Sequence, residues 1–234
     1  MVDVSIVIPF KFGAKYAFSS LLSCRLAMRG KNAEIVLCLD SPSDDERDLL
    51  QRQIRKAAAP VKLVENTGSG ISAAINSGID AASSEFILRH DIDDLMLPKR
   101  LDYCKEGFDR GFDFIFGSAL RFPKPKRLTV PANLAEARLR CLYENPFMHP
   151  ASAYTKKAIG DIGGYDPYFD GIEDFELWSR VLWSSCNIVT DQRLHVLYRK
   201  HKKQYSKSRN AKVTNLKRIE VFEKNRIRTI ASDT

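Results

Sequence analysis

The sequence has no apolar run close to the roughly 20 residues that a membrane-spanning helix needs. Its start, residues 1–9, has no basic segment, and the apolar run there is too short for the core of a secretory signal. We interpret this run as a first strand. These absences predict a cytoplasmic protein, and they leave open a peripheral contact with the inner face of the cytoplasmic membrane.

The sequence also lacks the cysteine patterns that are typical of disulfide-bonded and zinc-binding proteins. The five cysteines are an odd number and widely scattered, with no Cys-x-x-Cys pair and no histidine at a zinc-ligand spacing. This pattern predicts reduced, mostly buried thiols. They are Cys24, Cys38, Cys104, Cys141 and Cys186.

The remaining composition is that of an ordinary globular protein, with 44% hydrophobic and 28% charged residues. A chain of 234 residues is long enough for one α/β domain with a full core. The net charge of +8 is unevenly placed, because residues 193–228 hold thirteen Lys or Arg and two acids while everything else sums to −3. This basic segment suits anionic lipid headgroups, nucleic acid or an anionic polymer; the alternative is a solvated helix face near residues 212–228.

Expected strands and helices alternate through the first half of the chain. Each strand is a short apolar run, and the helices between them carry apolar residues at helical spacing or begin with capping residues. This alternation predicts a parallel, doubly wound α/β sheet. The expected strands are 5–9, 34–40, 61–64, 85–91 and 111–117, and the expected helices are 16–28, the segment ending near 58, 71–82 and 98–110.

The pattern changes after residue 118. A Pro- and Lys-rich connector at 121–126 leads to an amphipathic helix over 134–143 and then to a less regular half. A further helix begins at Glu173, with apolar residues on one face. Two strand-like segments follow at 187–190 and 194–198.

Three carboxylates, Asp91, Asp93 and Asp94, follow the fourth apolar run. On a strand, Asp91 and Asp93 project to the same side and can share a cation, for which oxygen ligands favour Mg²⁺ or Mn²⁺. The alternative is that Asp91 or Asp94 caps the next helix. Ligands bind beyond the carboxyl ends of parallel strands, so Pro9, Asp40 and this cluster should meet at one rim, which favours the metal site.

Several stretches, taken together and in order, carry a resemblance to a known family. They are Val4–Pro9, Leu39–Asp44, Ile71–Ile79, Asp91–Asp94 with Pro98, Arg100 and Leu101, Gly163–Asp166, Glu173–Arg180 and Tyr198–His201. Over roughly residues 4–205 the chain resembles the inverting GT-A-fold glycosyltransferases, often called family 2, that use nucleotide-diphosphate sugars. The resemblance implies a mainly parallel sheet with a smaller mixed region on the acceptor side and a basic C-terminal helix. It also implies one domain over 1–205, with a nucleotide-sugar half (1–118) and an acceptor and catalytic-base half (119–205), followed by a basic tail (206–234).

The resemblance assigns roles on the donor side. Asp40 would read the nucleotide base by accepting from a ring N–H, Asp91 would face the ribose and the metal, and Asp93 would be the main metal ligand. A bound Mn²⁺ or Mg²⁺ would neutralise the diphosphate leaving group. Arg199 and His201 resemble a tail motif that contacts diphosphate or metal. The other residues assigned to nucleotide-sugar binding are Pro9, Phe10, Lys11, Asn76 and Arg89.

On the acceptor side, Asp174 resembles the base that deprotonates the acceptor hydroxyl in an inverting transfer. Its place at a helix N-terminus favours the ionised form, whereas Glu173 beside it would raise its pKa by repulsion or would orient the acceptor. His149 resembles a residue that lines the acceptor in many members, and Gly164 and Trp178 are assigned to the same side. A purely structural role is the alternative for either acid and for His149.

Three positions depart from the family pattern. Lys11 stands where many members have an aromatic residue that stacks on the base. The usual acidic pair after the second strand is reduced to Asp40, and Ile75 stands where many members have an arginine. The usual aromatic residue for base stacking is therefore absent at position 11, and Arg89, Arg199 or the metal becomes more important for binding the diphosphate.

The implied activity is metal-dependent inverting transfer of a sugar from a UDP- or GDP-type donor to a hydroxyl of a saccharide or lipid-linked acceptor, in surface polysaccharide or lipopolysaccharide synthesis. Phosphatases of the haloacid-dehalogenase type carry Asp-x-Asp after the first strand, and sugar nucleotidyltransferases carry a Gly-rich phosphate loop there; this chain has neither. The other alternative is a non-catalytic basic module that binds membrane or nucleic acid and has a degenerate pocket. Asp93 and Asp174 together argue against it, and we expect no nucleic-acid partner.

Overall fold

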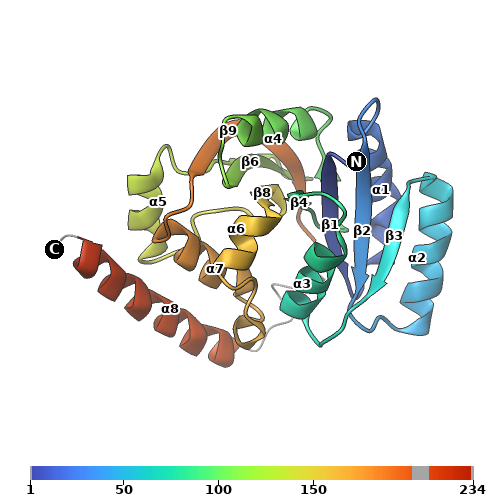
Figure 1. Ribbon diagram of the computed structural model, residues 1–234. Coiled ribbons are helices and arrows are strands. Elements are labelled where there is room, and N and C mark those ends of the chain that lie inside the picture. Colours follow the sequence, from blue (N-terminus) through green and yellow to red (C-terminus); the bar gives the residue numbers. More distant parts are fainter. Residues whose placement is uncertain (1, 202–210, 233–234) are drawn as a thin grey trace.

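The first strand, β1 (Val4–Phe10), is buried on both faces, as its unbroken apolar run predicts. Side chains alternate along it, so Ile6 and Ile8 enter one hydrophobic cluster while Val7 enters the other. Helices on both faces of the sheet enclose these clusters in the computed structural model, which describes residues 2–201 and 211–232 (Figure 1).

The strands of the described residues form one sheet in the order β3-β2-β1-β4-β8-β6-β9-β5, with β7 paired to β6. Pairing is parallel from β3 to β4 and between β6 and β9, whereas β8 runs antiparallel to both of its neighbours. The mainly parallel α/β architecture is therefore confirmed. The other strands are β2 (Ala33–Leu39), β3 (Val61–Glu65), β4 (Phe86–Arg89), β5 (Leu95–Met96), β6 (Phe114–Phe122), β7 (Lys126–Leu128), β8 (Ser152–Thr155) and β9 (Ile188–Arg199).

Two groups of helices cover the sheet. One face carries α1 (Ala14–Ala27), α2 (Asp44–Ala57) and α4 (Arg100–Asp109). The other carries α3 (Ile71–Ala81), α5 (Leu134–Cys141), α6 (Lys156–Asp161), α7 (Glu173–Leu182) and α8 (Ala211–Ser232), with short 3₁₀ turns at His149–Ala151 and Pro167–Phe169. None of the helices in the described ranges is both long and apolar enough to span a membrane. All five thiols are free and four of them are buried, as predicted.

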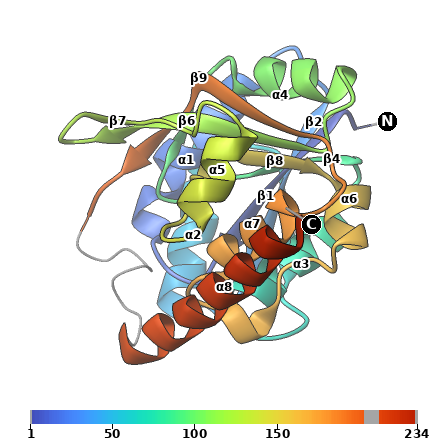
Figure 2. The ribbon, with the colours of Figure 1, turned by 90° about the vertical axis from the view of Figure 1, so that its left-hand side faces the viewer.

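Helix α8 packs along α7 at the surface (Figure 2). Its Val221 and Asn225 are buried, and its Phe222 ring lies 5.3 Å from that of Phe175 on α7. Asn225 also donates a hydrogen bond of 2.9 Å to the Cys141 carbonyl at the end of α5. The C-terminal helix is thus attached to the rest of the fold, while the predicted boundary at residue 205 lies outside the described residues.

Several predicted segments differ from the structure. The strand expected at 85–91 ends at Arg89, so the aspartates lie in a turn and the prediction that they alternate along a strand is wrong. The segments 187–190 and 194–198 form a single strand, β9, because the polar residues between them sit at a register shift against β6 near Gly117 and Ser118. The connector at 121–126 includes the paired ends of β6 and β7, and the short strands β5, β7 and β8 were not predicted.

Candidate active site

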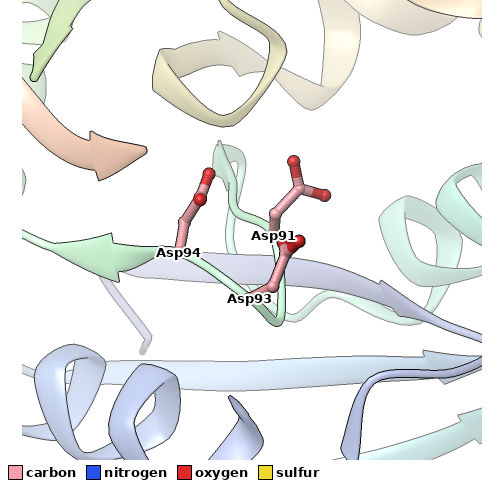
Figure 3. Close-up of side chains that lie close together, drawn as sticks. All are labelled: Asp91, Asp93 and Asp94. Carbon is pink, nitrogen blue, oxygen red and sulfur yellow. The ribbon is translucent and has the colours of Figure 1, made fainter. Parts of the chain in front are cut away.

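A turn after β4 brings three carboxylates together (Figure 3). Asp91, Asp93 and Asp94 each offer an oxygen atom, and these atoms lie within 4.8 Å of one another. The backbone N–H of Asp94 donates to the Asp91 carbonyl at 3.2 Å, which closes the turn. The turn therefore makes the carboxylate cluster that we expected from strand alternation.

Asp94 is fully buried. Its Oδ1 accepts a 2.7 Å bond from the Arg199 N–H, and its Oδ2 has no hydrogen-bond partner among the described residues. Burial, followed by the charges of Asp91 and Asp93, raises the pKa of Asp94 well above its usual range. Burial and the Asp91 charge also raise the pKa of Asp93. A divalent cation would satisfy the orphan oxygen and relieve the repulsion, so these residues fit Mg²⁺ or Mn²⁺.

The alternative role of these aspartates as helix caps is excluded. The N-cap of α4 is Lys99, and no side chain caps this helix. Asp94 instead ties the aspartate turn to the end of β9.

The end of β9 delivers two further predicted residues to the aspartate turn. His201 Nε2 lies 2.7 Å from Asp93 Oδ2, and Arg199 Nε donates to the Asp93 carbonyl at 2.6 Å. The Tyr16 ring, which the sequence reasoning missed, lies 4.8 Å from the His201 ring and 4.9 Å from the Arg199 guanidinium. Residues over 100 positions apart thus meet at the carboxyl ends of the strands.

A second polar group lies beyond β1 and β2. Lys11 Nζ is 3.2 Å from Asp40 Oδ2. Asp40 Oδ1 accepts bonds from the Gly70 N–H at 2.9 Å and from Asn66 Nδ2 at 3.1 Å. Of the adjacent predicted residues, Pro9 is half-buried and Phe10 is buried in the core. The sequence reasoning did not single out Asn66.

Arg89 and Asn76 serve protein groups in this structure. Arg89 is only 1% exposed and donates from Nη1 to Asp91 Oδ1 at 2.5 Å. Both ends of the Asn76 amide bind the Tyr165 backbone, through Nδ2 to the carbonyl at 2.8 Å and Oδ1 from the N–H at 3.0 Å. Gly164 lies against the same amide, since a Cβ there would be 3.1 Å from Asn76 Oδ1, and its φ of +66° favours glycine. Asn76 therefore anchors the segment that leads toward α7.

The two acids at the start of α7 lie in different surroundings. Asp174 is half-buried and accepts 2.8 Å bonds from Asn145 Nδ2 and from the Phe175 N–H. Glu173 is 2% exposed and accepts from the Gly171 N–H at 2.8 Å, with its other oxygen 4.0 Å from His149 Nδ1. Asp174 is thus the more accessible acid of the pair.

His149 continues a buried polar chain behind these acids. Its Nε2 lies 2.9 Å from the Tyr165 hydroxyl, which lies 3.3 Å from the Tyr154 hydroxyl. Burial, together with Tyr154, raises the pKa of Tyr165 well above its usual range. Trp178, which we had assigned to the acceptor side, is fully buried and meets the His149 ring edge-on at 5.9 Å, so it is a core residue in this structure. We did not predict the part that Tyr165 plays in this chain of hydrogen bonds. Its position in the Gly163–Asp166 stretch, which carried the family resemblance, was the only indication in the sequence.

This sheet has a carboxylate cluster beyond β4, and the buried Glu173 and half-buried Asp174 lie at the start of α7, an arrangement that agrees with the GT-A fold of glycosyltransferases. The family model described as Glycosyl transferase family 2 matches residues 5–165. The chain belongs to this family.

The relatives are themselves glycosyltransferases. The chain is 22% identical over 154 residues to the "Amylovoran biosynthesis glycosyltransferase AmsE" of Erwinia amylovora, covering 64% of this chain and 58% of that protein. It is 30% identical over 131 residues to the Escherichia coli "UDP-Gal:alpha-D-GlcNAc-diphosphoundecaprenol beta-1,3-galactosyltransferase", covering 50% and 45%. The matched region is therefore about half the length of these relatives.

Solved structures share the fold. S. aureus TarS 1-349 in complex with UDP-GlcNAc aligns with a TM-score of 0.71 at 14% identity, covering 98% of this chain and 73% of that one. The mannosyltransferase PcManGT from Pyrobaculum calidifontis, in complex with GDP-Man and Mn²⁺, aligns with a TM-score of 0.64 at 16% identity, covering 86% and 58%. The GT-A fold and the membership of glycosyltransferase family 2 that we predicted from the sequence are both confirmed.

Proposed function

We propose that this glycosyltransferase uses a divalent metal and an inverting mechanism to transfer a sugar from a UDP- or GDP-type donor to a saccharide or lipid-linked acceptor. The names of the relatives support a place in surface polysaccharide or lipopolysaccharide synthesis, since one is an amylovoran enzyme and another acts on a diphosphoundecaprenol acceptor. The observation that carries the proposal is the aspartate turn with His201 at 2.7 Å from Asp93. We place the reaction in the cytoplasm, at the inner face of the membrane.

The aspartate turn supplies the donor end of the reaction. Asp91, Asp93 and the Oδ2 atom of Asp94, with His201, would hold Mn²⁺ or Mg²⁺, and the ion would supply positive charge for the departing diphosphate. Arg89 orients Asp91 through their 2.5 Å ion pair. Arg199 fixes the turn from the other side, because it bonds both to Asp94 and to the Asp93 carbonyl.

Asp174 supplies the acceptor end. An inverting transfer needs one base that takes the proton of the attacking hydroxyl. Asp174 is the half-buried acid of the α7 start, and Asn145 Nδ2 holds its Oδ2 at 2.8 Å. Glu173 is buried against Gly171 and His149, so we assign it a positioning role.

Two substitutions separate these roles. Asp93→Asn should abolish metal-dependent donor binding, whereas Asp174→Asn should keep donor binding and lose transfer by about 10²–10⁴-fold, the usual contribution of general-base catalysis. The matched control is Asp161→Asn, which removes an exposed acid on α6. The measurements are thermal stabilisation by nucleotide sugars with Mn²⁺ and release of nucleoside diphosphate.

The outcomes are distinct. Full turnover in Asp174→Asn would remove this residue as the base. If the wild type binds nucleotide sugars but transfers none to any acceptor, the non-catalytic module becomes the better description.

Helix α8 is the part of the described chain that best suits a membrane surface. Opposite its buried Val221 and Asn225 it carries aliphatic side chains that are 46% to 68% exposed. Arg218 and Arg226 are exposed on the same helix, and Glu220 and Glu223 pair with Lys224 and Arg226. The exposed aliphatic side chains are Val213, Leu216, Ile219, Ile227 and Ile230. Glu220 and Glu223 share this face at helical spacing, and their ion pairs offset their charge. Aliphatic and basic side chains together favour contact with an anionic bilayer.

Co-sedimentation with vesicles containing anionic lipid tests this contact. The double substitution Ile219→Glu and Ile227→Glu should reduce binding, and the control Leu26→Glu, which alters an exposed leucine on α1, should not. Deleting the helix is a poorer test, because it would uncover the Cys141 carbonyl that Asn225 now satisfies. Equal binding of the double variant and the wild type would contradict the proposal.

A further inference from the structure

Serine hydroxyls on one face of α1 bind the segment that contains the aspartate turn. Ser20 and Ser23 are three residues apart, so they lie on the same face of the helix. Ser20 Oγ donates to the Asp91 carbonyl at 3.2 Å, and Ser23 Oγ accepts from the Met96 N–H at 2.9 Å. Helix α1 is therefore attached to both ends of residues 91–96.

The Ser20 hydroxyl is the last member of a buried polar chain. Ser20, His90 and Arg100 are all fully buried. His90 Nε2 lies 3.2 Å from Ser20 Oγ, and His90 Nδ1 lies 3.4 Å from Arg100 Nη1. A guanidinium group can only donate, so Nδ1 accepts and the ring proton is on Nε2. His90 therefore donates to Ser20, which leaves the hydroxyl hydrogen of Ser20 for the Asp91 carbonyl.

Arg100 attaches the other end of this chain to the sheet. Its Nη2 donates to the Arg89 carbonyl at 2.7 Å and to the Ser152 carbonyl at 3.0 Å. The guanidinium group is thus bound to the last residue of β4 and to the first residue of β8. The bonds from Arg100 to His90 and from His90 to Ser20 connect the centre of the sheet to α1.

The Asp91 carbonyl is the point at which this chain meets the aspartate turn. It also accepts from the Asp94 N–H at 3.2 Å, and two bonds use both lone pairs of the oxygen. The bond from Asp94 closes the turn, whereas the bond from Ser20 attaches the turn to α1. Because this carbonyl lies in the backbone between the side chains of Asp91 and Asp93, its position determines how these two carboxylates are placed relative to each other.

We infer that Ser20 is a positioning residue of the proposed metal site, and that His90 and Arg100 hold its hydroxyl in the donating orientation. The inference rests on the proposed function, because it concerns the turn that would hold Mn²⁺ or Mg²⁺. Ser20 acts through the backbone of Asp91. Without its hydroxyl, the carbonyl keeps one donor, and the mutual repulsion of the carboxylates is opposed less firmly. The affinity for the metal should then fall.

Titration of the full chain with Mn²⁺ tests this role, with the free ion followed by electron paramagnetic resonance in the absence of nucleotide and with UDP or GDP. Ser20→Ala should weaken Mn²⁺ binding by about tenfold, the factor that corresponds to one hydrogen bond. The matched control is Ser84→Ala at the other end of β4, where a buried serine donates to the Asp3 carbonyl at 2.8 Å and accepts from the Phe86 N–H. Both variants should lower the urea midpoint, but only Ser20→Ala should lose affinity for Mn²⁺.

The direction of the polar chain has a test that needs neither metal nor substrate. Long-range ¹H–¹⁵N spectra of the histidine side chains should show a proton on Nε2 of His90 and none on Nδ1. The signals are assigned by their loss in His90→Gln. A proton on Nδ1 would refute the directed chain.

The Mn²⁺ titration has three further outcomes that contradict defined statements. Equal affinity of Ser20→Ala and the wild type would show that Ser20 does not position the metal site. An equal loss in Ser84→Ala would assign the effect to lower stability of the fold. Failure of the wild type to bind Mn²⁺ with or without nucleotide would refute the metal dependence in the proposed function, whereas the spectra of His90 would still test the chain.

Discussion

Replacing Asn225 by leucine should destabilise the whole fold, although the residue lies on the last helix. Asn225 is fully buried; its Nδ2 donates to the Cys141 carbonyl at 2.9 Å, and its Oδ1 accepts from the Ser179 hydroxyl. Leucine has a similar size and no polar atom, so the carbonyl and the hydroxyl each lose a partner. An unsatisfied buried polar group costs about 1–3 kcal/mol, and Arg228 still reaches Ser179 at 2.5 Å, so we expect a total loss of about 2–4 kcal/mol.

Urea unfolding followed by circular dichroism measures this loss. With a urea slope of about 2–3 kcal/mol per molar, the midpoint should fall by about 0.7–2 M. The control Asn215→Ala, at an exposed position of the same helix, should leave the midpoint unchanged. An unchanged midpoint and slope in Asn225→Leu would show that α8 is not attached through this residue, and the docked position of the helix would then be refuted.

Two further predictions concern the core. Gly78→Ala should cost about 1–3 kcal/mol, because a Cβ there would lie 2.3 Å from Cys38 Sγ and 2.7 Å from Val7 Cγ1, whereas Gly160→Ala, where nothing lies within 4 Å, should be neutral in the same urea assay. Stability should also fall as the pH drops below about 6.5, the ordinary histidine pKa. Burial lowers the pKa of both His195 and His90, so the unfolded chain takes up protons there that the native state does not, and each histidine can contribute at most about 1.4 kcal/mol per pH unit. Urea midpoints at pH 7.5, 6.5 and 5.5 would show this slope, His195→Phe should reduce it, and a midpoint independent of pH would contradict it.

The first half of the fold could be predicted because burial on both faces leaves a clear mark in the sequence. In β2, Ile35 to Leu39 are all buried, so the strand reads as an unbroken apolar run ending in a carboxylate. Helix α2 was equally clear, since the Ser43 side chain caps it by accepting from the Glu46 N–H and three acids fill its first turn. In both elements, local chemistry and tertiary environment favour the same structure.

In the second half of the fold, the local sequence pattern and the tertiary environment do not favour the same structure. Strand β8 has only four residues and is completed by β4 and β6, so its pairing comes from the sheet and not from its own pattern. Within β9, Asp191 bonds to the side chains of Arg193 and His195, which interrupts the period of two where the strand shifts register against β6. A single sequence shows these residues as polar and gives no sign of the partners that place them in a strand.

In the active site, too, local sequence identifies some residues, whereas their geometry depends on distant parts of the chain. The carboxylates Asp91 and Asp93 were found from the sequence because acids directly after an apolar run are conspicuous, but their geometry depends on the turn that closes at Asp94 and on the distant end of β9. Ile75, which stands where many members of the family have an arginine, is fully buried. Arg89 uses its guanidinium on Asp91, and that of Arg199 bonds to the Asp93 carbonyl and to Ser19. Because both guanidinium groups bond to protein groups at the aspartate turn, the proposed function requires that a metal held by these carboxylates be the main counter-charge to the donor diphosphate.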